Sequence, residues 1–377
     1  MIGNLDIVVL QQIWWIICSI VGALFLFLTF VQGGQTLLWQ VAKDETEKSL
    51  VVNSLGRKWE LTFTTLVLFG GALFAAFPKF YATSFGGAYW VWMLILFSFI
   101  IQAVSYEYRT KPDNFLGQKV YETFLFINGS VGILLIGAAV GTFFTGSNFT
   151  LNDMNQVAWT NSLRGMEAAF SFFNLSLGLF LVFNARVLGA MYLVNNIDFT
   201  ETPELEVRLR KNCLTSFLCA LPFLLYVLVS LLLIDGYGLD GNGVVSMVAY
   251  KYLGNLLAMP AVLGMLLVGL LLVIMGVLRT SLGTGTSGIW FGGLGTVFVG
   301  LVIFFTAGFN NTAFYPSKVD LQSSLSIYNA SSSHYTLTVM TYVAFMIPFV
   351  LAYVIYVWRQ MDSRKIDLND IADKKAY

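Results

Sequence analysis

Long apolar runs separated by shorter polar stretches dominate the chain. Nine of them reach the length of about 20 residues that an α-helix needs to cross the hydrocarbon core of a bilayer. Their approximate bounds are 10–31, 60–83, 87–108, 121–144, 165–191, 213–235, 255–278, 289–309 and 336–358. The runs are continuous rather than alternating, which favours helices over the strands of a membrane β-barrel. The pattern predicts an all-α integral membrane protein with nine transmembrane helices in a single domain.

Lys and Arg side chains are distributed unevenly between the two sides that nine spans would create. Of the 21 such residues, 17 fall on one side, and the other side holds only Lys79, Arg164, Lys251 and Lys318. Because cytoplasmic loops of membrane proteins are enriched in Lys and Arg, this predicts an N-terminus outside and a C-terminus in the cytoplasm. Residues 360–377 then form a short charged cytoplasmic tail.

Composition supports a membrane location and excludes several classes of site. The chain is 57% hydrophobic and 11% charged, whereas a soluble domain carries roughly 25% charged residues. Its net charge is zero, which gives no reason to expect a nucleic-acid partner. The three cysteines lie in apolar runs without a CxxC motif, so we interpret them as packing residues and expect no metal site.

Two features that resemble cofactor motifs have simpler interpretations. The segment Gly283–Gly288 reads GTGTSG, but it joins two predicted spans instead of following a strand, so we expect a turn and no dinucleotide site. His334 is the only histidine and falls in a polar loop before the last span. We therefore expect it on the outer surface and not as a haem ligand.

Polar side chains near the predicted cytoplasmic ends of three spans are the best candidates for function. Gln32 and Gln35 end the first span, Glu60 opens the second, and Glu107 closes the third beside Arg109. An ionisable group within the membrane is costly and is often functional. These residues predict an inlet for protons, while the alternative is that they are interfacial side chains that reach water.

The chain resembles subunit II of the cytochrome bd-type quinol oxidases over most of its length. The segments that carry the resemblance are Ile13–Trp15, Gly70–Pro78 with Tyr81, Tyr108–Lys111, Phe314–Pro316 and Ser326–Tyr342. The second and the last of these segments together make the resemblance specific.

The resemblance implies a non-catalytic, haem-free subunit of a terminal oxidase that oxidises quinol and reduces O₂ to water in a bacterial cytoplasmic membrane. Subunit I of this family holds the quinol site, two haems b and one haem d. Subunit II has two four-helix bundles and one peripheral helix. It supports subunit I, and in some members it contributes part of a proton path or holds a quinone as a structural lipid. Small single-span subunits are further possible partners.

The departures from the family pattern concern the proton path. Many members end the first span with Asp-Gly-Phe-Asp, where this chain has Gln32-Gly33-Gly34-Gln35. An amide binds water but does not take up and release a proton near pH 7. Many members have Trp-Asp where this chain has Trp59-Glu60, so Glu60 is the best candidate for a titrating relay. The family commonly has Gln at the position of His334.

Two other classes remain as alternatives to an oxidase subunit. One is a multi-pass secondary transporter, which would show broken helices at matching places in two halves and a site near the membrane midplane. The other is a scaffold of another membrane complex. The strongest polar groups of this chain lie at span ends, which favours the oxidase subunit.

Overall fold

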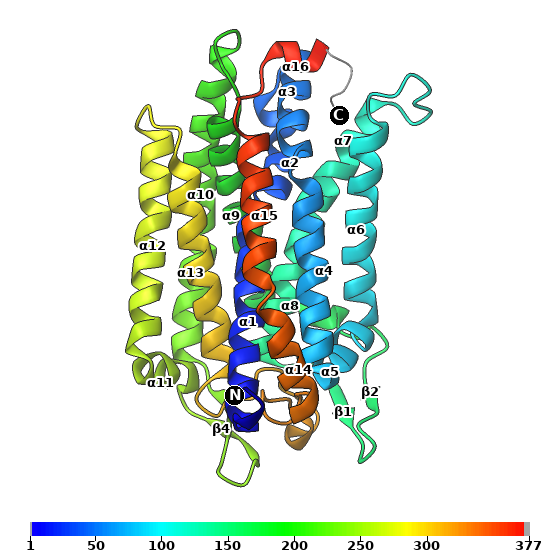
Figure 1. The fold of residues 1–377 in the computed structure, drawn as a ribbon, viewed down its shortest axis with the longest axis vertical. Coiled ribbons are helices and arrows are strands. Elements are labelled where there is room, and N and C mark those ends of the chain that lie inside the picture. The colour runs from blue at the N-terminus through cyan, green and yellow to red at the C-terminus, as the bar shows by residue number, and fades with distance from the viewer. Residues whose placement is uncertain (1, 373–377) are drawn as a thin grey trace.

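A computed structural model of the chain describes residues 2–372, so 373–377 of the predicted tail lie outside the described residues. The molecule is an elongated bundle of helices that run roughly along its longest axis (Figure 1). We name its two ends after the termini. Residues 2–6 lie at the N-terminal end, and α16 (Leu368–Ala372) lies at the C-terminal end.

The helices account for most of the chain, and short hairpins lie at the N-terminal end. The long helices are α1 (Ile7–Leu28), α2 (Phe30–Val41), α3 (Glu45–Gly56), α4 (Trp59–Ala76), α6 (Tyr89–Tyr108), α7 (Gln118–Ile127), α8 (Ile133–Thr145), α9 (Phe172–Asn196), α10 (Pro203–Leu233), α12 (Pro260–Ser281), α13 (Gly288–Gly308), α14 (His334–Ala344) and α15 (Ile347–Met361). Shorter elements are α5 (Pro78–Tyr81), α11 (Lys251–Ala258), two π-helical segments (Ala82–Gly86 and Asn128–Gly132), three 3₁₀ turns (Ile2–Asn4, Met166–Phe170 and Leu321–Ser323) and the antiparallel pairs β1–β2 (Phe149–Leu151 and Val157–Trp159) and β3–β4 (Gly236–Leu239 and Val245–Val248).

Within residues 2–372, eight helices or nearly continuous helix pairs are long and apolar enough to cross a membrane, and α14 with α15 makes a ninth if this pair is one span. The pair is bent by 41°. A proline lacks the amide hydrogen and its ring clashes with the carbonyl four residues earlier. Pro348 places that clash at Ala344, the last residue of α14, so the chain bends there. The mostly helical architecture and the membrane class predicted from the sequence are confirmed.

Several helices continue past the apolar runs at the C-terminal end. The second span was predicted from residue 60, but helix begins at Glu45, where Asp44 accepts a hydrogen bond from the Glu47 amide. Similarly, α10 begins at Pro203, ten residues before its apolar run, and carries Glu206–Arg210 as an i,i+4 ion pair. An apolar run ends at the first charged residues. The helix itself can extend beyond that point, because capping residues and i,i+4 ion pairs stabilise its polar turns.

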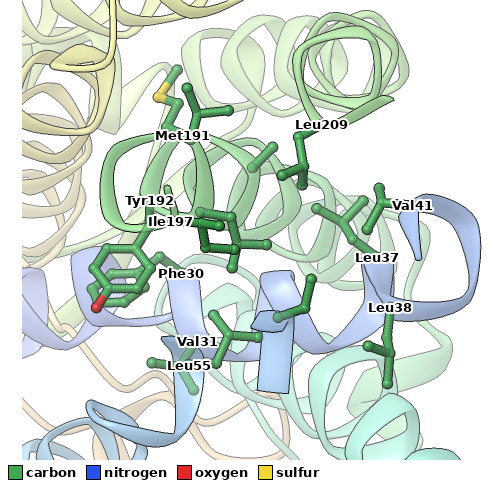
Figure 2. Packing of buried hydrophobic residues seen from close by; sticks show 14 of the residues in the cluster. Phe30, Val31, Leu37, Leu38, Val41, Leu55, Met191, Tyr192, Ile197 and Leu209 are labelled. Atoms are coloured by element: carbon green, nitrogen blue, oxygen red, sulfur yellow. The ribbon is translucent and has the colours of Figure 1, made fainter. Parts of the chain in front are cut away.

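A buried apolar core joins these extensions into one body at the C-terminal end (Figure 2). It combines residues of α2, α3, α9 and α10, and Ile366 before α16 is fully buried with them. Ile366 also forms a parallel β-bridge with Ile197. We call this body, made of α3, the end of α9, the start of α10 and residues 362–372, the C-terminal cap.

The contact between α2 and α9 is so close that their backbones touch. A methyl group built on Gly33 would overlap the carbonyl of Ala185, and one on Gly189 would overlap the backbone of Gly34. Small residues allow such approach in membrane proteins, where helix packing depends on close van der Waals contact. This contact fixes which α2 side chains face the interior.

We predict that Gly33→Ala lowers the thermal stability of the assembled protein in detergent. The added methyl group has to push α2 and α9 apart, and overpacking of this kind costs typically about 1–3 kcal/mol. The matched control is Gly264→Ala in α12, where an added methyl group meets no atom within 4 Å. A melting temperature that falls equally for both variants would contradict the importance of the contact.

Candidate proton-transfer site

A line of polar side chains follows one face of α6 into the interior of the bundle. Ser98, Gln102, Tyr106 and Arg109 are spaced four, four and three residues apart, which places them on one face. All four are buried, with Arg109 1% exposed. They face α2, α7 and the π-helical segment Asn128–Gly132. The polar line therefore leads from the C-terminal end of the bundle towards its middle.

Four charged residues at the beginning of this line form a closed ion cluster. Arg109 Nη2 lies 2.9 Å from Glu122 Oε1 and 3.0 Å from Glu45 Oε2. Lys48 Nζ lies 2.8 Å from Glu45 Oε1 and 3.2 Å from Glu122 Oε2. Trp39 Nε1 donates a further hydrogen bond of 2.9 Å to Glu122 Oε2. Two acids and two bases thus balance, which is what allows Glu122 to be 1% exposed.

Deeper in the bundle the charges give way to neutral polar groups. Gln35 Nε2 donates to the Tyr106 hydroxyl at 3.0 Å, and Gln32 Nε2 donates to Gln102 Oε1 at 3.4 Å. One turn further, Asn128 Nδ2 donates to Ser98 Oγ at 3.3 Å. We call these residues the amide row.

The amide row holds several polar atoms without a protein partner. Among the described residues, no group bonds to Gln32 Oε1, Gln35 Oε1, Gln102 Nε2 or Asn128 Oδ1. All four side chains are 0–2% exposed. A buried polar atom left without a partner costs about 1–3 kcal/mol. Each of these atoms can therefore form a further hydrogen bond, such as one to a water molecule.

The structure brings together two of the four candidates from the sequence and separates the other two. Gln32 and Gln35 lie inside the amide row. Glu60 and Glu107 are exposed on the surface. Glu107 lies 3.3 Å from Lys111, with both side chains more than half exposed, and Glu60 forms no ion pair within residues 2–372.

The two exposed glutamates are sequence neighbours of residues that belong to or contact the interior line. Trp59, which precedes Glu60, stacks on Tyr106 with ring centroids 5.8 Å apart. Glu107 directly follows Tyr106 in α6. The backbone positions of the two glutamates therefore lie near the same depth as the Tyr106–Gln35 hydrogen bond, while their carboxylates are exposed.

A second buried charge holds the C-terminal cap to the bundle. Lys58 Nζ lies 2.8 Å from Asp362 Oδ1 and 5.0 Å from the centre of the Trp358 ring. Asn196 donates to the same carboxylate oxygen at 3.1 Å, and its own carbonyl accepts from Ser54 Oγ at 2.8 Å. Residues of α3, α9 and the end of α15 thus meet around this one ion pair.

An apolar cavity of about 50 Å³ lies in the other half of the bundle. Residues of α9, α10, α12 and α13 line much of it, among them Phe180, Leu224 and Val273. Asn184 and Thr296, 3.4 Å apart, supply the polar atoms of its wall. The rest of the lining is apolar.

Sequence reasoning overlooked Glu122, Lys48 and Gln102. Glu122 falls inside the predicted span 121–144, so an ionisable residue within an apolar run was the available signal. For Gln102, the signal was its four-residue spacing from Ser98 and Tyr106. Lys48 carried no such signal, because its pair with Glu45 lies within α3 and its pair with Glu122 connects helices that are distant in sequence.

Comparisons with known proteins agree with one another over nearly the whole chain. The family model for cytochrome bd terminal oxidase subunit II matches residues 10–361. Cytochrome bd-I ubiquinol oxidase subunit 2 of Escherichia coli (strain K12) is 27% identical over 382 residues, which cover 96% of each chain. A probable cytochrome oxidase subunit 2 of Haemophilus influenzae is 33% identical over 159 residues, 42% of each chain.

The fold of the chain also resembles that of a chain in a solved bd oxidase structure. A chain in the structure of bd oxidase from Geobacillus thermodenitrificans superposes with a TM-score of 0.66 at 15% sequence identity. The match covers 95% of this chain and 100% of that chain. Together with the family match, which includes both the amide row and the ion cluster, this shows that the chain belongs to the family of cytochrome bd terminal oxidase subunit II.

Proposed function

We propose that this subunit holds no haem and serves as the support of subunit I and as a proton inlet. Membership of the family makes it a subunit of a quinol oxidase complex in the inner membrane, with subunit I as its partner. In the proposal, subunit I carries two haems b, one haem d and the quinol site. In support, the only histidine, His334, lies at the N-terminal end with Nε2 2.9 Å from the Leu5 carbonyl oxygen.

The proposed orientation places the C-terminal end of the bundle in the cytoplasm. The uneven distribution of Lys and Arg supports it, and so does the position of the ion cluster and the C-terminal cap, which hold many of these charges. The polar line would then open towards the cytoplasm, where the protons for O₂ reduction would come from.

The proposed contact face for subunit I is the side formed by α4 and α14–α15. No residue of α15 is buried, and Phe349 and Tyr353 are 70% and 68% exposed. α14 contacts α4 (Figure 1). The Lys58–Asp362 ion pair joins the beginning of α4 to the end of α15. Glu60 is exposed on α4, and a carboxylate that faced lipid alone would be costly. A partner at this face would shield Glu60 from lipid, while Glu60, in the first turn of α4, would keep access to water at the end of the bundle.

The main observation in support of a proton inlet is the buried amide row, which continues inwards from the ion cluster. Glutamine and asparagine cannot titrate near pH 7, but they can orient water molecules through which a proton moves. In the proposal, Glu60 and Glu107 collect protons at the surface, and water bound by Gln32 and Gln35 passes them inwards. The apolar cavity would hold an acyl or isoprenoid chain of a structural lipid or quinone.

The first test is the composition of the purified complex. We expect the chain to co-purify with a second large membrane protein and to show haem d absorbance in a reduced-minus-oxidised spectrum. A stable, haem-free monomer that transports a solute would instead support the transporter alternative and would end this proposal.

Glu60→Gln is expected to slow O₂ consumption of the assembled oxidase while its haem spectrum stays intact. The amide keeps the shape of the side chain but removes the group that binds a proton. Glu201→Gln is the control, because Glu201 is an exposed carboxylate of the same end, in the loop between α9 and α10. Unchanged turnover of the Glu60 variant would remove this residue from the proton path.

Gln35→Leu tests the amide row itself. Leucine has a similar volume but binds no water, so we expect a lower turnover at unchanged haem content. The control is Asn184→Leu, which removes a buried amide beside the apolar cavity, away from the row. Equal activity of the two variants would show that protons do not pass along Gln35.

A further inference from the structure

Arg186 of α9 is a partly buried arginine without an acidic partner. Within residues 2–372 no carboxylate lies within 4 Å of its guanidinium group, although most other arginines at this end form ion pairs. Nη1 donates to the Thr36 carbonyl and hydroxyl at 3.1 and 2.9 Å, and Nη2 donates to Gln40 Oε1 at 2.5 Å. Nε has no acceptor among the described residues.

Its depth can be derived from the neighbouring helix. Cys213 Sγ lies 4.0 Å from the carbonyl oxygen of Val187, the residue after Arg186. Cys213 is the first residue of the apolar run of α10 and directly follows Lys211 and Asn212. Arg186 therefore lies at the level where α10 passes from charged to apolar sequence, which is the boundary between lipid headgroups and hydrocarbon.

The surroundings of Arg186 have the character of a membrane interface. Trp39, beside Gln40 at the end of α2, is 44% exposed, and tryptophan prefers the headgroup level. On α10, Lys211, Thr215 and Cys219 are exposed and four residues apart, so they form one stripe. The stripe adjoins the end of α2, because Arg208, three residues before Lys211, donates to the Val41 carbonyl oxygen at 2.6 Å.

This patch carries positive charge that no acid in the described chain neutralises. Lys211 forms no ion pair within residues 2–372. Two acids of the nearby C-terminal cap already have partners, since Glu47 pairs with Arg208 and Glu206 pairs with Arg210. The ion cluster around Glu122 is also balanced. The positive charge of this patch could therefore be neutralised by an anion from outside the chain.

We propose that Arg186, with Gln40 and Lys211, binds the phosphate of an anionic phospholipid in the leaflet at the C-terminal end. A guanidinium group offers a planar set of donors that fits phosphate oxygens, and basic pockets between membrane helices on one side are typical headgroup sites. Leu218, which is 56% exposed on the same side of α10 as Cys219, offers apolar surface for an acyl chain. This inference is independent of the proposed proton inlet.

The test uses the purified oxidase complex after delipidation in detergent. Phosphatidylglycerol or phosphatidylcholine is added back, and the melting temperature and the lipid retained are measured, the latter by native mass spectrometry. We expect phosphatidylglycerol to stabilise the wild-type complex more than phosphatidylcholine. Arg186→Gln should bind it about fivefold more weakly or worse, since a cation near the membrane surface contributes about 1 kcal/mol.

Two further variants separate charge from shape and from folding defects. Arg186→Lys should retain part of the preference for phosphatidylglycerol, because it keeps the positive charge but loses the planar set of guanidinium donors. Thr215→Asp changes an exposed residue of the α10 stripe and should weaken binding by repulsion even if Arg186→Gln does not assemble. Arg279→Gln, at an exposed site at the end of α12 without an ion pair within residues 2–372, is the control and should behave as wild type.

Three results would overturn the proposal. The first is an equal response to phosphatidylglycerol in the wild type and in the Arg186 and Thr215 variants. The second is stabilisation by millimolar inorganic phosphate that matches that of the lipid, because the site would then take a free anion. The third is loss of subunit I from Arg186→Gln at saturating lipid, because the counter-ion would then be a carboxylate of the partner subunit.

Discussion

The contact between the backbones of α2 and α9 is the constraint on which the C-terminal half of the molecule depends. Gly33 and Gly189 lack the side chains that would separate the two helices. With this distance fixed, α2 has one face against α9 and its other faces free for α6 and α7. The glutamines of α2 then point to α6, Trp39 reaches Glu122, and Thr36 and Gln40 reach Arg186. One close approach thus determines the position of the amide row, the ion cluster and the unpaired arginine.

The two kinds of buried charge in this subunit are compensated differently. The ion cluster is closed within the chain, because each of its carboxylates meets both of its cations. Breaking a buried pair of this kind costs about 3–5 kcal/mol, so the cluster also joins α3, α6 and α7 mechanically. Arg186 has only neutral acceptors, and its charge remains available to the surroundings. The ion cluster stabilises the subunit itself, whereas Arg186 can interact with an anion from outside the chain.

Hydropathy along the sequence predicts much of the architecture. It does not predict which side chains of a helix face the interior and which face outwards. Apolar length predicts the helices that can cross the membrane, and the position of Gln32, Gln35, Glu60 and Glu107 near span ends predicts their similar depth. The same data do not say that the two glutamines face the interior while the two glutamates face out. Those directions follow from the α2–α9 contact and from the Trp59–Tyr106 stack. Glu122 lay within a predicted span, but its ion pairs with Arg109 and Lys48 depend on tertiary structure.

The ion pair between Lys58 and Asp362 has a consequence for the order in which the subunit is made. Lys58 is 2% exposed at the beginning of an early helix, and its counter-ion lies just after the last spanning helix. Chains are synthesised from the N-terminus and their parts fold as they emerge. The ammonium group therefore stays without its carboxylate until nearly the whole polypeptide has been released and its final helix inserted. The Lys58–Asp362 ion pair therefore forms only in a subunit whose last helix has been inserted. A chain truncated before Asp362 would keep an unpaired Lys58 ammonium group beside the C-terminal cap.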